Sequence, residues 1–252
     1  MTIERTTLVN YLDSLLNIKG IADVSCNGLQ VEGAEEISRI GLAVDACQSV
    51  FTRAAELGCQ MVLVHHGIIW GGLKSITGPV YKQVSSLITS NVGLYAAHLP
   101  LDVHPTLGNN AVLAHMLNLE DIYPFGEYHG IPIGYAGALP EAMSAEDIGA
   151  ALQKHIGGTA SMLPFGKKLN RTVAIVSGGG SDALPEAIAN RIDCFITGEP
   201  SHWNHHAALE AGINVIYSGH YNTETVGVRA LGNHLQEIFE VDAVFIDEPT
   251  LV

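Results

Sequence analysis

Short apolar segments of strand length alternate with helical segments along most of the 252 residues. Ile40 to Val44 and Met61 to Val64 are fully apolar, and the stretch 49–58 between them has helical periodicity and ends on glycine. The second half alternates in the same way, with strands predicted over 172–176, 193–197, 213–217 and 243–246 and helices over 182–191, 200–211 and 223–239. Buried strands separated by helices form parallel sheets, so the sequence predicts an α/β fold with mostly parallel or mixed sheets.

Two segments of equal length share one pattern. Residues 39–67 and 171–199 each run through an arginine, a strand, a turn, a helix, a second strand and a small polar turn. Beyond them, 93–102 aligns without gaps on 215–224, which matches Tyr with Tyr and His with His. We interpret the pattern as an internal duplication. The alternative is two independent βαβ units, which α/β folds often contain.

The duplication predicts two similar α/β halves as domains. The first half covers residues 1–125 and carries the earlier histidines, and the second covers 126–252. The hydrophobic content of 47% gives each half enough apolar side chains for a core.

Charge and cysteine usage limit the partners and the compartment. The formal net charge is −14, from 12 basic and 26 acidic side chains, which argues against a broad nucleic-acid or anionic-lipid surface. No apolar run has the length of about 18 residues that a membrane span needs, and the N-terminus lacks a signal-peptide pattern. The four cysteines form no CxxC pair. These features predict a cytoplasmic protein with reduced thiols and no membrane partner.

Histidines and carboxylates follow the predicted strands. His65 and His66 directly follow the apolar run that starts at Met61. In each half a later strand is followed by a histidine and, four residues further, by a carboxylate. Ligands in open α/β sheets sit beyond the carboxyl ends of strands. The predicted metal ligands are therefore three histidines and two carboxylates, namely His65, His66, Asp102, His220 and Glu224.

This mixed set of ligands suits Zn, Fe, Mn or Ni. Five ligands are too many for one tetrahedral catalytic zinc and too few to saturate two ions, so we expect two divalent ions that share ligands and activate water. Each residue also has a simpler interpretation when taken alone. Asp102 could organise a turn, Glu224 could complement a helix dipole, and the histidine pair could be one buried and one surface side chain. Only their combination favours a metal site.

Other polar features rank lower. His98 matches His220 in the repeat and is a candidate for lining the site or orienting a ligand. One of His205 and His206 could reach the metals or a substrate, although a surface helix is the alternative. The run Ser177-Gly-Gly-Gly-Ser181 is a weak phosphate-binding pattern, because it lacks the lysine of a P-loop and the spacing of a dinucleotide fingerprint.

Several motifs together carry a family resemblance. They are Asn27-Gly-Leu-Gln-Val-Glu-Gly33, Val64-His-His-Gly67, His98-Leu-Pro-Leu-Asp102, Gly108-Asn-Asn110, Thr197-Gly-Glu199 and Gly219-His220-x3-Glu224. In this order they closely resemble the family of GTP cyclohydrolase I type 2 homologues, also named after NGG-interacting factor three. The resemblance runs from about residue 5 to the C-terminus. The chain resembles the short bacterial form, since 118–170 is too short to hold the extra domain of some members.

The resemblance implies two interlocked α/β halves and a binuclear metal site whose ligands match the five residues named above. It also implies a ring-shaped homohexamer, built as a trimer of dimers. The main hypothesis for function is a metal-dependent hydrolase acting on a small or nucleotide-like substrate, with Glu224 and Asp102 holding or bridging the ions. A cyclohydrolase reaction on GTP is a narrower form, although the sequence has no guanine-recognition pattern. The alternatives are a non-enzymatic metal-binding scaffold and, more weakly, a DNA-associated ring in damage response.

Overall fold

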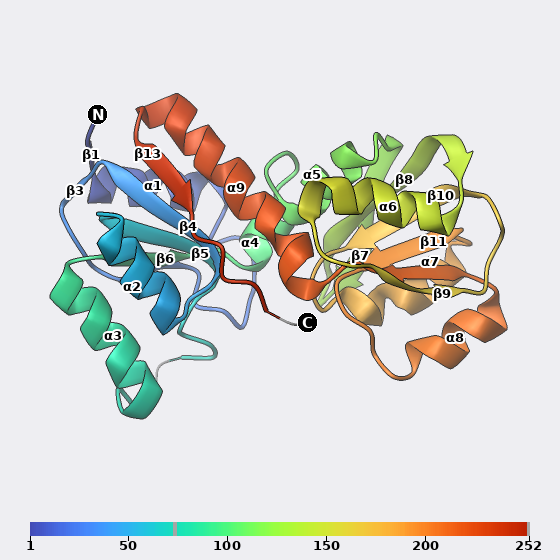
Figure 1. The fold of residues 1–252 in the computed structure, drawn as a ribbon, viewed down its shortest axis with the longest axis horizontal. Helices are drawn as coiled ribbons and strands as arrows, with labels where there is room; N and C mark the ends of the chain where they lie inside the picture. The colour runs from blue at the N-terminus through green and yellow to red at the C-terminus, as the bar shows by residue number, and fades with distance from the viewer. Residues whose placement is uncertain (73–74, 251–252) are drawn as a thin grey trace. The chain divides into compact units, whose positions relative to one another are not determined.

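The computed structural model describes residues 1–72 and 75–250, which form two compact units (Figure 1). The first unit comprises Met1–Leu101 and Val228–Glu248, and the second comprises Asp102–Gly227 with Pro249 and Thr250. Each unit contains one large sheet with helices packed against it, which confirms the predicted α/β class. No helix among the described residues is both long and apolar enough to cross a membrane.

The chain passes between the units more than once. Helix α9 (His220–Phe239) begins in the second unit and ends in the first. The boundary predicted between residues 125 and 126 lies within strand β7 (Glu120–Tyr128), whereas the compact units divide at Asp102 and at Val228. The sequence pattern could not reveal this division, because it depends on which sheet the C-terminal strand joins.

The sheet of the first unit has the strand order β13-β4-β5-β6-β2. Its first four strands run parallel to one another, and β2 pairs antiparallel with β6. The strands are β2 (Gly28–Val31), β4 (Arg39–Asp45), β5 (Met61–His66), β6 (Gly93–Ala96) and β13 (Asp242–Phe245). A separate two-stranded ladder joins β1 (Ile3–Glu4) to β3 (Glu36–Ile37).

Helices cover both faces of this sheet. On one face, α2 (Gln48–Glu56) and α3 (Gly78–Ser90) pack their buried side chains against alternate residues of the central strands. The intervening strand residues point to the opposite face, where the Tyr95 hydroxyl donates to Asp13 of α1 (Arg5–Leu15) at 2.9 Å. On that same face, Gly232 of α9 approaches so closely that a Cβ there would collide with Leu42. Burial on both faces explains why these strands are apolar throughout.

The sheet of the second unit has the order β7-β8-β10-β11-β12-β9. Neighbouring strands pair in parallel from β10 to β12, whereas β7, β8 and β9 pair antiparallel with their neighbours. The strands are β7, β8 (Ile131–Met143), β9 (Ser161–Pro164), β10 (Asn170–Val176), β11 (Cys194–Thr197) and β12 (Asn214–Tyr217).

Two pairs of helices cover this second sheet. One core contains α5 (Asn109–Met116) and α6 (Ala145–Ile156), and the other contains α7 (Leu184–Ala189) and α8 (Asn204–Ala211). Ser144 caps the start of helix α6, since its hydroxyl accepts from the Asp147 N–H at 3.0 Å.

One strand arrangement occurs in both units. In the first unit β4, β5 and β6 lie side by side in parallel, with antiparallel β2 beside β6. In the second unit β10, β11 and β12 repeat this order, with antiparallel β9 beside β12. In each case the antiparallel strand precedes the three parallel ones in the chain. This shared topology agrees with the two similar halves expected from the internal repeat.

The hairpin formed by β7 and β8 was not anticipated from the sequence. Its two-residue turn, His129 and Gly130, has φ values of 51° and 82°. Positive φ at both turn residues is typical of a type I′ hairpin turn. Most of β7 is exposed, so its residues lack the apolar periodicity that predicts a strand.

Asp193 ties the starts of β10 and β11 together. Its carboxylate accepts from Lys167 Nζ at 2.5 Å and from two backbone N–H groups, those of Arg171 and Thr172. Burial alone would raise the pKa of Asp193, but these hydrogen bonds outweigh burial and lower the pKa below its ordinary value. The carboxylate is therefore charged in the folded state at neutral pH.

We predict that Asp193→Asn lowers the free energy of unfolding by about 1–2 kcal/mol at pH 7, because hydrogen bonds to a charged acceptor are lost. We expect a loss of this modest size because the Lys167 side chain is exposed, so water screens its attraction to Asp193. The pKa of Asp193 is lower in the folded protein than in the unfolded chain, where it is about 4. Its charge therefore stabilises the fold above about pH 4, and this stabilisation is lost as pH falls through the folded-state pKa. Urea unfolding from pH 7 to pH 3 should therefore show the wild type and the variant converging in acid. Glu237→Gln, at an exposed position of α9, is the control, and an equal loss at pH 3 and pH 7 would contradict the prediction.

Candidate metal centre

Three histidines gather at the carboxyl ends of two neighbouring strands in the first unit. His65 and His66 are the last residues of β5, and His98 follows the end of the adjacent parallel strand β6. Ligand nitrogens from the three rings all lie within 4.8 Å of one another. The ring centroids of His65 and His98 are 5.1 Å apart, and those of His65 and His66 are 4.7 Å apart. The structure thus places the two histidines predicted as ligands beside His98.

Each of these imidazoles has an acceptor at its Nδ1 atom. His65 Nδ1 lies 2.9 Å from the Ala97 carbonyl oxygen, which can only accept, so this nitrogen carries the hydrogen. His66 Nδ1 lies 2.8 Å from the Asp45 carboxylate. Fixing Nδ1 as the donor makes Nε2 the nitrogen with the lone pair, which is the usual state of a metal-binding histidine.

His98 is held in the same way by Asp23. Its Nδ1 lies 3.0 and 3.1 Å from the two Asp23 carboxylate oxygens. The Asp23 side chain is only 1% exposed and also accepts from the N–H groups of Ser25 and Leu99. Burial alone would raise the pKa of Asp23, but the hydrogen bond from His98 and its other hydrogen bonds outweigh burial and hold the pKa well below its usual value. A charged, buried carboxylate therefore orients the third imidazole.

Asp102 lies in the second unit, where two side chains fix its carboxylate. It is 6% exposed, and its Oδ1 atom accepts from Asn109 Nδ2 at 2.8 Å and from Ser177 Oγ at 3.4 Å. Asn109 is itself held, because its carbonyl oxygen accepts from the Gly227 N–H in α9. The predicted ligand is thus a buried, oriented carboxylate at the end of α4 (Leu99–Asp102).

His220 and Glu224 form the other predicted ligand pair, and they occupy the first turns of α9. His220 Nε2 lies 3.2 Å from Glu224 Oε1, and His220 Nδ1 lies 3.1 Å from Glu199 Oε2. Burial alone would lower the pKa of His220, but the hydrogen bonds and charges of Glu224 and Glu199 outweigh burial and raise the pKa to about 9. His220 is therefore a cation held between the carboxylates of Glu224 and Glu199. A divalent cation could replace the proton that His220 Nε2 shares with Glu224, since an imidazole nitrogen and a carboxylate oxygen are good metal ligands.

The glycine turn after β10 leaves the space that Glu224 occupies. Gly178 has φ of +59°, and a Cβ on it would collide with the Glu224 carboxylate and lie 3.1 Å from His220 Nε2. Its backbone N–H donates to Thr223 Oγ1 at 3.0 Å. The run Ser177-Gly-Gly-Gly-Ser181 thus makes room for a histidine and a carboxylate. This contact explains the glycine at its second position.

The remaining histidine candidates lie elsewhere. His205 and His206 are exposed on α8, and the His205 ring packs edge-on against Phe165 at 5.1 Å. Within residues 1–72 and 75–250 neither belongs to a group of three potential metal ligands.

Sequence reasoning missed the partners that orient the ligands. Asp45 ends the buried strand β4, and Glu199 follows β11 inside the motif Thr197-Gly-Glu199, so the positions of both after predicted strands could have indicated them. Asp23 lies in an irregular loop and had none. These carboxylates matter because their hydrogen bonds decide which ring nitrogen faces the site.

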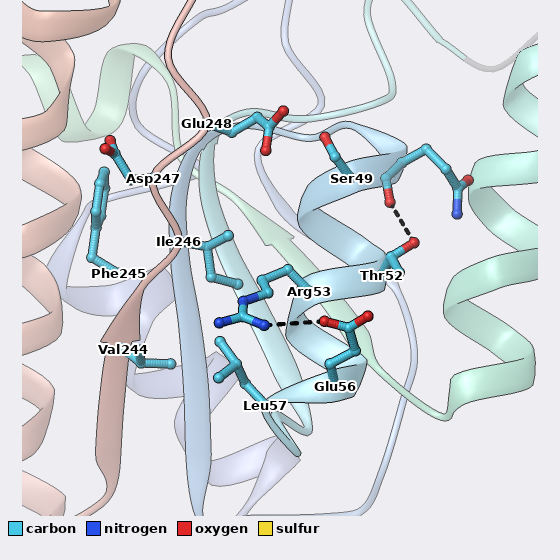
Figure 2. Close-up of a pocket in the computed structure, with 11 residues that line it drawn as sticks. Ser49, Thr52, Arg53, Glu56, Leu57, Val244, Phe245, Ile246, Asp247 and Glu248 are labelled. Atoms are coloured by element: carbon cyan, nitrogen blue, oxygen red, sulfur yellow. Dashed lines mark hydrogen bonds and ion pairs between the residues drawn. The ribbon is translucent and has the colours of Figure 1, made fainter.

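A separate groove in the first unit contains none of the predicted metal ligands. It has a volume of about 700 Å³ and lies between α2 and residues 244–248. Figure 2 shows that the charged side chains on its α2 wall, Arg53 and Glu56, pair with each other, at 3.1 Å. None of the residues that line it is a histidine. The groove therefore lies apart from the predicted ligands.

Comparison with known proteins gives consistent matches over the full length. The model of one family, described as Duf34/NIF3 (NGG1p interacting factor 3), matches residues 3–250. A GTP cyclohydrolase 1 type 2 homolog from Archaeoglobus fulgidus is 46% identical over 96% of this chain and 97% of its own. A protein of the same name from Deinococcus radiodurans is 42% identical, with coverages of 98% and 94%. The crystal structure of TTHA1606 from Thermus thermophilus is 39% identical, with a TM-score of 0.92 over 99% of this chain and 100% of that one.

The glycine turn yields a prediction with a matched control. Gly178→Ala should lower the free energy of unfolding by about 1 kcal/mol for positive φ and by a further 1–3 kcal/mol for the collision with Glu224. Gly58 has φ of +69° but open space around its Cβ position, so Gly58→Ala should show only the first loss. Urea unfolding of both variants measures the difference. Equal losses would mean that the close approach to Glu224 is unimportant.

Proposed function

Because this chain belongs to the Duf34/NIF3 (NGG1p interacting factor 3) family, we propose that it is a metal-dependent hydrolase acting on a small or nucleotide-like substrate. The observation that carries the proposal is the state of the histidines at the ends of β5 and β6. Each has its Nδ1 atom fixed by a carbonyl or carboxylate oxygen, which leaves Nε2 of His65 and His66 to coordinate a metal and turns Nε2 of His98 away from its fixed partner. Histidines that serve only to fill a core need no such common orientation.

The donor set fits divalent ions. Imidazole and carboxylate together suit Zn, Fe, Mn or Ni, and the proposed ligands are His65, His66, Asp102, His220 and Glu224. Two such ions, when bound, would act as Lewis acids and lower the pKa of a water molecule. That the five residues share two ions rests on the sequence motifs and the family match. Support from the structure comes separately from each unit, in the orientation of the ligands there.

The protein's own residues have distinct tasks in this proposal. Asp45 and the Ala97 carbonyl orient the two adjacent histidines, and Asn109 orients Asp102. Orienting partners of this kind typically contribute 10- to 100-fold to metal affinity. Glu224 is a buried carboxylate beside His220, so its removal should weaken metal binding.

The substrate proposal has a narrower form. The relatives from Archaeoglobus fulgidus and Deinococcus radiodurans are named as homologues of a GTP cyclohydrolase. A cyclohydrolase adds water to a purine ring and opens it, which is the kind of reaction that an activated water supports. We also propose that the protein acts in the cytoplasm as a homohexamer, a trimer of dimers, without a membrane partner, and its net charge of −14 disfavours a nucleic-acid partner.

Elemental analysis tests the proposal first. Protein purified without chelator or histidine tag should carry about two transition-metal ions per chain. Glu224→Ala should lose at least one of them, because a coordinating carboxylate is removed, and should also lose turnover of any substrate found. His155→Ala, which changes an exposed histidine at the end of α6, should keep the wild-type content.

Three results would contradict different parts of the proposal. A wild-type protein without metal that also takes up none on titration with Zn, Fe, Mn and Ni would end the proposal. Full metal content with GTP left unchanged by the loaded protein would remove only the cyclohydrolase form. Turnover that survives unchanged in Glu224→Ala would show that Glu224 and the ion it holds have no part in catalysis.

A further inference from the structure

Trp70 is an exposed aromatic side chain beside the histidine cluster. The residue is 42% exposed, yet its ring centroid lies 5.0 Å from that of His98 in an edge-to-face arrangement and 6.0 Å from that of His66. Leaving a large aromatic surface in water has a free-energy cost that burial elsewhere would avoid. An aromatic side chain kept at the rim of a polar cluster therefore suggests a ligand contact.

The loop that carries Trp70 is held firmly. The indole N–H donates to the Gly67 carbonyl oxygen at 2.9 Å. On either side of Trp70 the backbone is tied to the segment 24–26, by Gly71 N to the Val24 oxygen at 2.7 Å and by Cys26 N to the Ile69 oxygen at 3.0 Å. An isolated β-bridge between Ser25 and Trp70 lies between these bonds. The position of the indole is thus set before any ligand arrives.

The residues on either side of the segment 24–26 also fix the ring that Trp70 contacts. Asp23 binds His98 Nδ1, and Asn27 Oδ1 accepts from the His98 backbone N–H at 2.7 Å. Since Asp23 occupies Nδ1, the other ring nitrogen, Nε2, is the one that can meet a polar group. Trp70 and His98 therefore make a preorganised surface with an aromatic part and a polar atom, next to His65 and His66.

A planar heteroaromatic ring matches both features of this surface. Its face can stack on an indole, and the nitrogen and oxygen atoms at its edge can bond to an imidazole, whereas an aliphatic group offers only apolar contact. We infer that Trp70 and His98 bind a planar heteroaromatic ring of nucleobase type and hold its edge toward His65 and His66. The inference rests on the proposed function and specifies the substrate class of that site.

Fluorescence of Trp70 tests the inference directly. The chain has two tryptophans, so Trp203→Phe leaves Trp70 as the only indole. The probes are the 5′-monophosphates of guanosine, adenosine, cytidine and uridine, with ribose 5-phosphate as the probe that lacks a ring. At least one nucleotide should quench Trp70 emission saturably, and ribose 5-phosphate should not. No saturable quenching by any nucleotide, or equal quenching by ribose 5-phosphate, would overturn the inference.

Variants separate stacking from a structural effect. Equilibrium dialysis should show that Trp70→Leu weakens binding of the best nucleotide about tenfold or more, since stacking on the indole is lost. Trp70→Phe should keep most of the affinity, and Trp203→Leu, also at an exposed tryptophan, should change nothing. An unchanged dissociation constant in Trp70→Leu would refute the stacking role. Metal content should be equal in all of these proteins, so bound metal with no nucleotide binding would refute this inference and leave the proposed metal site intact.

Discussion

The candidate site depends on the register in which β5 pairs with its two parallel neighbours. Val64 pairs with Ala96 of β6, and His66 pairs with Asp45 of β4. This register brings the Asp45 carboxylate to His66 and the Ala97 carbonyl to His65, and it puts His98 beside both. A slip of one residue would turn every side chain to the other face, so the apolar cores that fix the register also fix the orientation of the histidines.

The second unit uses the same principle with different side chains. The parallel strands β10, β11 and β12 end at Val176, Thr197 and Tyr217, and backbone hydrogen bonds continue past their ends, as from Gly198 N to the Gly178 oxygen. These bonds hold two glycine-containing turns together where α9 begins. Helix α9 then presents His220 and Glu224 from consecutive turns of one face, where residues four apart lie next to each other. The repeated topology thus yields a histidine and a carboxylate at equivalent positions after β6 and β12.

The sequence predicted the parts of the fold that follow from local periodicity. Strands β4, β5, β10 and β12 and their helices were placed within a few residues, because apolar runs bounded by glycine and polar turns are local signals. Helix α9 starts at His220 and not near residue 223, so His220 lies within the helix and reaches Glu224 across one turn. The hairpin of β7 and β8 was missed because its exposed residues carry no apolar pattern. The compact units were not foreseen, since the position of β13 beside β4 joins residues about 200 apart in the chain.

The site was predictable only in its ligand types. Histidines and carboxylates after strands can be read from the sequence, whereas the partners that orient them come from distant segments, such as Asp23 beside His98. The central claim is that this orientation serves metal coordination. Anomalous diffraction from crystals of metal-loaded protein, collected at the absorption edge of the bound metal, tests it most directly. If the two histidines bind metal, anomalous peaks will lie about 2.0–2.2 Å from the Nε2 atoms of His65 and His66. A fully loaded crystal with peaks only at surface histidines such as His205 would contradict it.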